Sequence, residues 1–566
     1  MRHCPNIGDN SMLQNMARTD TDLVDAIIRR QERLAAERIN WETHWQEIAV
    51  RVLPRQDEFL RKRTGGEKRT EHLYDATAAL ALERFAAAME SMLVPRTQRW
   101  HRLRATDERL NEDAEVRAWF DRVTQILFAT RYSTHANYAS QQHETFMSLG
   151  AFGTGALLIE GIDGKGIRYK SVHLAELFIA EDRHGRIDTV HRRFEYTARQ
   201  AKQAWGERLP ARIADCAETE PERKFEFIHC VKPREDVKPG RADWRGMPWA
   251  SYYVSVEGRE LLSESGFHKF PYAISRYVTA PREVYGRSPA MIVLPDIKML
   301  NEMSKTVIRA AHKTVDPPLL LHDDGVLGLS RGGRPNLDPG ALNVGGIDDQ
   351  GRPKVLPLQT GARPDLGLEL MDQRRKVIND AFLVTLFQIL VDGPAMTATE
   401  VLERTREKGA LLAPTMGRQQ SEALGPMIER ELDILARVPG ALPPMPDALK
   451  RAGGAYEIEY DSPLNRAQRA EDGAAINRVL QSVAPLVNID PSIMDAFDKD
   501  AIVRILADVN GVPEKALRSE EAIAALRQQR QQAQAMQQMA TLAPPAARAV
   551  KDISEAQAAA RPGGAA

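Results

Sequence analysis

Two long amphipathic segments, separated by a stretch of different composition, place the strongest constraint on the fold of this 566-residue chain. Residues 295–315 and 366–390 both follow a helical pattern and are bounded by prolines. Between them, residues 323–359 are rich in Gly, Pro and Asp, with apolar strand candidates at 319–321 and 355–358. The stretch is either a linker or a compact β-containing projection carried by two helices. We favour the projection, because both flanks are long and amphipathic.

The spacing of apolar residues changes near residue 150. Before it, side chains such as Leu23, Ile27 and Leu34 recur at helical spacing, so residues 21–150 are expected to form a helical region. Residues 151–284 instead contain short β-type runs separated by Gly and Asp turns, which is typical of a small, mostly antiparallel β-domain with a helical insert. The fold is therefore predicted to be α+β and mostly helical.

Helical patterns return in the last third of the chain. Thr397 and Glu400 match a capping box, in which a hydroxyl and a carboxylate satisfy free amides at the start of a helix. The pattern continues to about residue 437, with breaks expected at Pro414 and at Gly425-Pro426. A Gln- and Ala-rich helical run at 527–538 can self-associate or stay solvated.

Composition excludes several classes of protein. There are 77 basic and 78 acidic residues, so the formal charge is −1, whereas proteins that grip DNA tightly usually carry a basic excess. The three cysteines show no CxxC spacing, which favours reduced thiols over a disulfide framework or a zinc site. We find neither an export signal nor an apolar run long enough for a membrane helix, and expect no membrane contact.

No catalytic, metal or cofactor site is predicted. The run at 161–166 lacks the spacer and the Ser/Thr of a phosphate-binding loop, and the run at 150–155 is followed by a strand instead of a helix whose N-terminal amides could bind an anion. His143-Glu144 is not followed by a second histidine that would complete a zinc-protease helix. The best carboxylate cluster for a nuclease, His322-Asp-Asp324, looks like an isolated turn.

A basic stripe is the most informative surface feature. In residues 295–315, the side chains of Lys298, Lys305, Arg309 and Lys313 fall within an arc of about 80° of a helix. Glu302 lies inside the stripe and is close enough to pair with Lys298 and Lys305. In a single chain, a solvated face with local ion pairs explains the stripe. Repeated around a ring, the same stripes would form basic collars facing a channel.

Four segments resemble the head-to-tail connector, or portal, family of short-tailed bacteriophages (podoviruses, T7-like). They are Phe152–Ile159, Tyr285–Met291 running into Leu294–Asn301, Met396–Val401, and Tyr460–Arg469. Each motif alone is modest, but their order and spacing cover most of the chain. The resemblance implies a ring, typically of about twelve subunits, at one capsid vertex.

The resemblance also assigns parts of such a ring to ranges of this chain. Residues 21–150 would be a helical wing region and 151–284 a β-rich wing subdomain, with 285–318 and 364–390 as the two stem helices and 319–363 as the clip. Residues 391–470 would hold the tunnel loop and further wing helices, and 471–545 a helical crown, between flexible ends at 1–20 and 546–566. The tunnel-loop candidates are Val391, Asp392, Gly393, Pro394, Ala395, Met396 and Thr397.

The implied function is a conduit for packaging and ejection of double-stranded DNA, found in the virion and assembled in the bacterial cytoplasm. Its implied partners are other copies of the chain, DNA held weakly and without sequence preference, the terminase motor, the tail adaptor, and the scaffolding and major capsid proteins. Two alternatives come from other classes: a phage nuclease or other DNA-processing enzyme, and a cellular helical adaptor. The first needs clustered metal-binding carboxylates, and the second would remain monomeric or dimeric.

Overall fold

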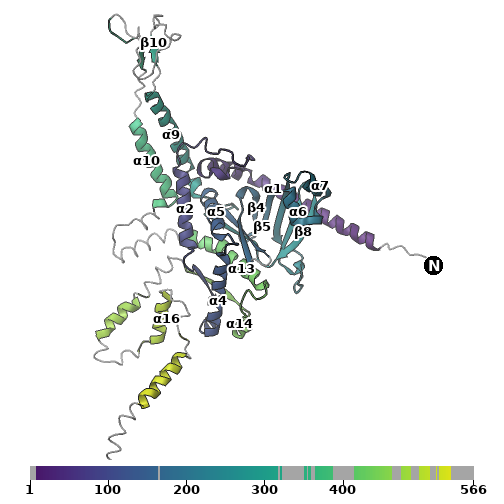
Figure 1. Cartoon of the computed structure of the whole chain (residues 1–566), viewed down its shortest axis with the longest axis vertical. Helices are drawn as coiled ribbons and strands as arrows, with labels where there is room; N and C mark the ends of the chain where they lie inside the picture. The colour runs from purple at the N-terminus through teal and green to yellow at the C-terminus, as the bar shows by residue number, and fades with distance from the viewer. Residues whose placement is uncertain are drawn as a thin grey trace, which may run out of the picture. The chain divides into compact units, whose positions relative to one another are not determined.

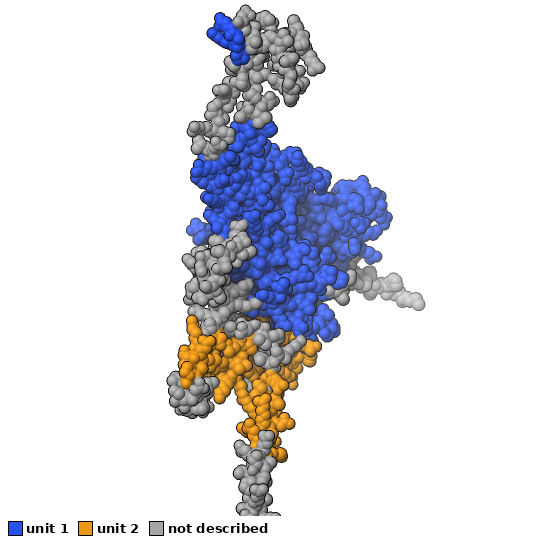
Figure 2. All heavy atoms as spheres, turned by 60° about the vertical axis from the view of Figure 1, so that its left-hand side comes forward, with its two compact units in different colours: residues 1–101, 124–443, 460–464 blue, residues 102–123, 444–459, 465–566 orange. Residues whose placement is uncertain are grey.

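The computed structural model describes residues 8–162, 166–315, 319–321, 350–353, 355–357, 364–385, 414–461, 473, 475–485, 496–509, 518 and 522–536. Over these residues the protein is α+β and mostly helical, as predicted (Figure 1). It divides into two compact units, coloured separately in Figure 2. Unit 1 comprises residues 1–101, 124–443 and 460–464, and unit 2 comprises residues 102–123, 444–459 and 465–566.

The first helix is longer than predicted. Helix α1 spans Gly8–Val52, so residues 8–20, expected to be flexible, are helical. No Gly or Pro occurs from residue 9 to residue 53, and nothing in the local sequence therefore interrupts the helix before Pro54. Further along α1, Val24, Ile27 and Ile28 are buried.

A five-stranded antiparallel sheet forms the larger part of the β-rich region. Its strands, in spatial order, are β4 (Leu177–Glu181), β5 (Ile187–Thr197), β6 (Lys224–Pro233), β7 (Trp249–Ser255) and β8 (Glu260–Phe267). Alternate residues of β6 point to opposite faces. Ile228 and Cys230 pack with α1, whereas Phe225 and Phe227 pack with α6 (Ala198–Trp205) and α7 (Ala211–Thr219). The sheet is antiparallel and carries α6 and α7 between β5 and β6; of these elements, α7 and β8 were not predicted.

A three-stranded antiparallel sheet has the order β3-β2-β9. Its strands are β2 (Thr154–Ile162), β3 (Gly166–Ser171) and β9 (Tyr272–Arg276). Helix α5 (Tyr138–Phe152) packs on β2 and β3, and α2 (Thr77–Leu93) packs on α5. Gly150 of α5 allows this approach, because a Cβ there would lie 2.6 Å from Leu82 of α2.

Two glycines bring the end of α5 against the segment that leads out of β9. Gly153 has φ +77°, and a Cβ placed on Gly286 would lie 2.1 Å from the Gly153 carbonyl oxygen. The amide of Gly286 donates to Thr154 Oγ1 at 2.9 Å, and the amide of Tyr277 donates to the Gly153 oxygen at 2.9 Å. Ser288 donates to the carbonyl of Ala151 at 2.8 Å and caps the short helix α8 (Pro289–Ile292). Two of the family-like motifs therefore meet through their backbones.

Helices α9 (Leu294–Val315) and α10 (Pro364–Ala381) form what we call the two-helix element. Strands β10 (Leu319–Leu321) and β11 (Val355–Pro357) pair antiparallel, so both predicted strand segments are strands. The prediction that the second helix runs without a break to residue 390 is wrong. It ends at Ala381, where Phe382 is buried against Phe85 and Leu383 takes a positive φ of 59°. Core packing of Phe382 overrides the local helical pattern.

The expected break at Gly425-Pro426 is also wrong. One helical run, described from Pro414 onwards, widens into a π-helical turn, η5 (Gln420–Leu424), and continues as α13 (Gly425–Arg437). The π turn lies next to Pro426, which lacks the amide that a regular α-helix would use. A proline can therefore lie within this helical run, which we call the 414–437 helix.

A buried ion pair in unit 1 involves the 414–437 helix. Arg131, at the end of α4 (Ala114–Arg131), contacts Glu431 of α13 through two hydrogen bonds of 3.0 and 2.5 Å. Tyr169 donates to the same carboxylate at 2.5 Å, and the guanidinium lies 4.6 Å from the Trp100 ring. The side chains of Arg131 and Glu431 are 0% and 1% exposed.

Unit 2 contains a two-stranded sheet and several helices. Strand β1 (His101–Ala105) pairs with β12 (Tyr456–Tyr460), although the pairing was not foreseen. Its described helices include α3 (Glu108–Asn111), α14 (Asp447–Arg451) and α16 (Lys499–Val509). The predicted C-terminal helical region is helical at 475–485, 499–509 and 522–536, and Arg527 pairs with Asp500 through two bonds of 2.7 Å.

Candidate functional site

The two-helix element is held together by a short apolar seam. Leu300 of α9 and Met371 and Ile378 of α10 are buried, and the Ser304 hydroxyl lies 3.4 Å from the Met371 sulfur. Gly367 allows close approach, since a Cβ there would lie 3.0 Å from Val307. The helices are therefore packed against each other before any other chain is considered.

Asp75 attaches the element to the segment that precedes α2. Its carboxylate accepts from Arg375 of α10 at 2.9 Å and from the amide of Thr77 at 2.9 Å, and it lies 3.5 Å from the Ser304 hydroxyl. Burial opposes the charge of Asp75, but these hydrogen bonds outweigh it and lower its pKa. Asn301 adds a second attachment, because its side chain accepts from the amide of Tyr74 at 2.8 Å.

The basic stripe of α9 is partly occupied by ion pairs. Lys298 is exposed and lies 2.5 Å from the Glu47 carboxylate of α1, rather than pairing with Glu302 as expected. The bond from Lys298 lowers the pKa of Glu47. Lys305 does pair with Glu302, at 3.3 Å, and its ammonium lies 5.6 Å from the Tyr74 ring. Local ion pairing thus accounts for two of the four basic side chains.

Arg309 differs from these two lysines. It is exposed and forms no ion pair with any residue that the structure describes. The fourth member of the stripe, Lys313, lies in α9, but its side chain is outside the described part of the chain. Lys298, Lys305 and Arg309 therefore lie along one helix, and among these three only Arg309 has no ion-pair partner in the described part of the chain.

Several sequence-based candidates fall outside the described residues. They include the carboxylate cluster at 322–324, the capping box at 397–400 and the tunnel-loop candidates Val391, Asp392, Gly393, Pro394, Ala395, Met396 and Thr397. The roles proposed for these residues remain predictions.

Comparison with known proteins decides the family. The family model described as "Bacteriophage head to tail connecting protein" matches residues 24–517. The chain belongs to this family. It is 30% identical over 525 residues to the probable portal protein of Bordetella phage BPP-1, covering 89% of this chain and 90% of that protein. It is 28% identical over 553 residues to the portal protein of Salmonella phage epsilon15, covering 96% and 97%. This chain is thus a head-to-tail connector, and the nuclease and adaptor alternatives are not favoured.

The connector contains two histidine pairs that have the composition of catalytic dyads. His229 lies 3.0 Å from Ser251 Oγ and 2.8 Å from Tyr272 Oη, and His191 lies 3.3 Å from Cys230 Sγ. All of these side chains are buried, and burial lowers the pKa of His229 to about 3 and raises that of Cys230 to about 12. A sealed imidazole that stays neutral beside a protonated thiol or a hydroxyl packs the sheet and does not meet a substrate.

The described residues of the connector contain no group of three or more His, Cys, Asp or Glu side chains placed to hold a metal ion. Within that same part of the chain, no helix combines the length and apolar character required to cross a bilayer.

Exposed apolar side chains on the two-helix element were not predicted from the sequence. Met299 and Ile308 of α9 and Leu370 and Val377 of α10 are between 41% and 48% exposed. Only the packing of the chain shows their exposure. Met299 and Ile308 are nine residues apart, which places them on opposite sides of α9, so the exposed apolar side chains do not all lie on one face.

Proposed function

We propose that this connector forms a closed ring of about twelve copies at one vertex of the capsid. Double-stranded DNA would pass through the ring during packaging and ejection, bound weakly and without sequence preference. The ring would be assembled in the bacterial cytoplasm and retained in the virion. It would also be the docking platform for the terminase motor, the tail adaptor, and the scaffolding and major capsid proteins.

Within this ring, the described elements take the parts named for the family. The two-helix element would be the stem, and the chain around β10 and β11 would be the clip. Residues 21–284 would form the wing, residues 391–397 the tunnel loop, and residues 471–545 the crown. The two portal relatives align along nearly the whole chain, which supports this assignment of parts.

The observation that carries the proposal is the basic side of α9 on a nearly neutral protein. Arg309 is exposed without a partner among the described residues, and Lys305 is held by an exposed pair with Glu302 and by its contact with the Tyr74 ring. Exposed ion pairs contribute about 0–1 kcal/mol, so Lys305 can exchange its partner for a phosphate at small cost. Repeated around a ring, a few such charges would attract DNA without gripping it, which suits a conduit through which DNA must slide.

The uncovered apolar residues support self-association. Met299, Ile308, Leu370 and Val377 occupy the two-helix element, which is packed internally and still leaves them exposed. Neighbouring copies in a ring would bury them, because head-to-tail contacts of one subunit with the next use different surfaces of the same element. This would contribute about 25 cal/mol per Å² of apolar surface removed from water.

The ring is tested by measuring mass and shape in solution. The purified full-length protein should form a closed assembly of about twelve copies with an axial hole, visible by electron microscopy. A protein that stays monomeric at every concentration, under conditions that favour assembly, would refute the proposal.

The basic stripe is tested by charge reversal. The double variant Lys305→Glu, Arg309→Glu should still form rings but package or retain less DNA, and Arg309→Glu should cause more of the loss than Lys305→Glu. A matched control is Arg199→Glu, Arg212→Glu in the helical insert, where both side chains are exposed and weakly paired at 3.7 and 3.9 Å. Normal packaging in the stripe variant, or an equal defect in the control, would show that the basic stripe serves only local ion pairing.

A further inference from the structure

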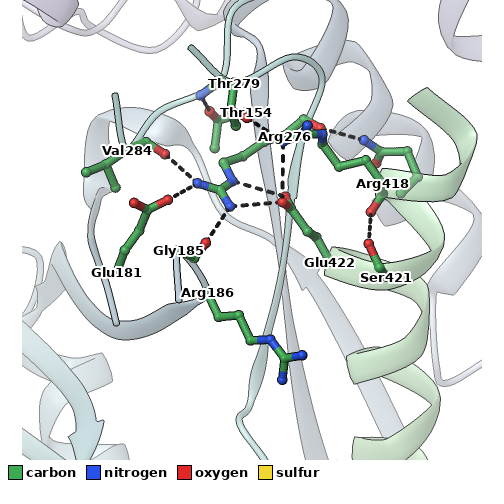
Figure 3. A network of polar contacts seen from close by, with 12 residues as sticks. Thr154, Glu181, Gly185, Arg186, Arg276, Thr279, Val284, Arg418, Ser421 and Glu422 are labelled. Carbon is green, nitrogen blue, oxygen red and sulfur yellow. Dashed lines mark hydrogen bonds and ion pairs between the residues drawn. The ribbon is translucent and has the colours of Figure 1, made fainter. Parts of the chain in front are cut away.

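Arg276, the last residue of β9, is 4% exposed, and all three nitrogens of its guanidinium donate hydrogen bonds (Figure 3). Nε and Nη2 donate to the two carboxylate oxygens of Glu422 at 3.0 and 2.9 Å. Nη1 donates to Glu181 and to the carbonyl of Val284 at 3.1 Å, and Nη2 also donates to the carbonyl of Gly185 at 3.0 Å. One side chain thus joins the β4–β5 hairpin, the segment after β9 and the π-helical turn.

The 414–437 helix reinforces this junction with two further side chains. Gln419 Nε2 donates to the backbone carbonyl of Arg276 at 2.9 Å. Arg418 donates to the hydroxyl of Thr279 and lies 3.7 Å from Glu422. The helix is therefore attached both to the end of strand β9 and to the segment that follows it.

The position of the junction in the chain gives it significance. Residues 277–288 lead from β9 into α8 and α9, which begins the two-helix element. The 414–437 helix is the first described helical run after α10 and residues 384–385. The segment before the two-helix element and the helix after that element thus both bond to the guanidinium of Arg276. The helix contacts the guanidinium through its π turn, a feature that often marks functional sites.

The energetics of the junction favour a role in positioning over one in stability. Burial opposes the charge of Arg276, and the bonds from Glu422 and Glu181 outweigh it, so the pKa of the guanidinium is raised. Even when so paired, buried ion pairs often add little net stability relative to apolar side chains, because desolvation offsets the attraction. What they do impose is geometry, since a bidentate bond between guanidinium and carboxylate restricts both distance and angle.

We propose that Arg276 is a positioning residue that fixes both chain segments flanking the two-helix element to the end of strand β9. A displacement of α9 would then be shared by the helix that follows α10, and the two would respond to passing DNA as one body. This inference rests on the proposed function of the two-helix element in the DNA path.

The test removes the charges together, so that none is left buried and unpaired. The variant is Arg276→Met, Glu181→Gln, Glu422→Gln in the full-length protein. The control is Arg234→Met, Glu264→Gln, on the edge strand β8 and the segment after β6. It matches closely, because side-chain exposure is 2% and 25% for Arg234 and Glu264 and 5% and 23% for Arg276 and Glu422.

Hydrogen exchange on the protein without DNA is the first measurement. In the Arg276 variant, amides in both 277–288 and 414–424 should exchange at least about tenfold faster, which corresponds to about 1.4 kcal/mol, with the five-stranded sheet unchanged. The control should change neither segment. The milder variant Glu422→Gln should release 414–424 alone, which keeps the test decisive if the triple variant does not fold. Acceleration of only one segment in the triple variant, or of neither segment, would overturn the proposal.

Packaging is the second measurement. Rings of the Arg276 variant should assemble normally but give fewer DNA-filled capsids than rings of the control. An equal loss in the control would show that the defect is a general effect of removing a buried ion pair, and would also overturn the proposal. Failure of the wild-type protein to form DNA-conducting rings would refute the proposed function instead, and the exchange result would still test Arg276.

Discussion

Replacing Gly286 by alanine should separate the two backbones that meet after α5. The new Cβ would lie 2.1 Å from the Gly153 carbonyl oxygen, and neither group can turn away because both belong to the backbone. Overpacking of this kind costs about 1–3 kcal/mol. The required shift would also break the bonds of 2.9 Å from the Gly286 amide to Thr154 and from the Tyr277 amide to Gly153, at about 1–3 kcal/mol each. A total of about 5 kcal/mol is expected.

Hydrogen exchange of the amides in residues 277–288 measures this loss directly. A penalty of about 5 kcal/mol accelerates exchange by a factor of several thousand, and it is large enough to reduce the yield of folded protein. Gly417→Ala is the control, because this exposed helical glycine has no atom within 4 Å of the added Cβ and should gain about 0.5–1 kcal/mol. Folded Gly286→Ala with exchange within tenfold of the wild type would refute the steric argument.

Three further predictions concern buried groups. Burial lowers the pKa of His191 and His229 to about 3, below the value of 6.5 for an unperturbed imidazole. The unfolded chain therefore binds more protons than the folded chain below pH 6.5. As the pH is lowered from 6.5 towards 3, the free energy of unfolding should fall by about 1.4 kcal/mol per pH unit for each imidazole. Urea unfolding at pH 7 and pH 5 measures this, and equal stability at both would contradict it. Glu431→Gln leaves the Arg131 charge buried without its partner and should cost about 3–5 kcal/mol by thermal unfolding, more than Arg131→Met, Glu431→Met does; equal losses would argue against an uncompensated charge. Burial raises the pKa of Cys230 to about 12, so iodoacetamide at about pH 8 should modify Cys216 but leave Cys230 intact until the protein unfolds. Peptide mapping would detect the opposite result.

Sequence patterns were most reliable for helix α9 and for the strands of the β-rich region. The segment predicted at 295–315 is α9 (Leu294–Val315), and strands β2 to β7 each coincide with a predicted β-type run. The four family-like motifs were also sufficient to indicate the connector family that the family model then showed. The spacing of apolar residues reflects the burial of one face of an element, and that burial is the main contribution to the formation of such elements.

The failures arise where a distant residue decides the outcome. Phe382 ends α10 by packing against Phe85, and the π turn keeps Pro426 within a helical run. In the candidate site, the pair between Glu302 and Lys305 follows from their spacing of three residues. The partner of Lys298 does not, because Glu47 lies 251 positions away in the sequence. No local pattern contains that information.

The short ladder between β10 and β11 has an evolutionary consequence. Leu319 pairs with Pro357 and Leu321 pairs with Val355. The two strands therefore hold together the chain that leaves α9 and the chain that returns to α10. Lengthening a closed loop costs little, about 0.6 kcal/mol for each doubling of its length. An insertion between β10 and β11 should therefore cost little in loop-closure entropy. A lineage of phages could adapt this end of the connector to new binding partners while the helix pair, and whatever passes along it, stays as it is.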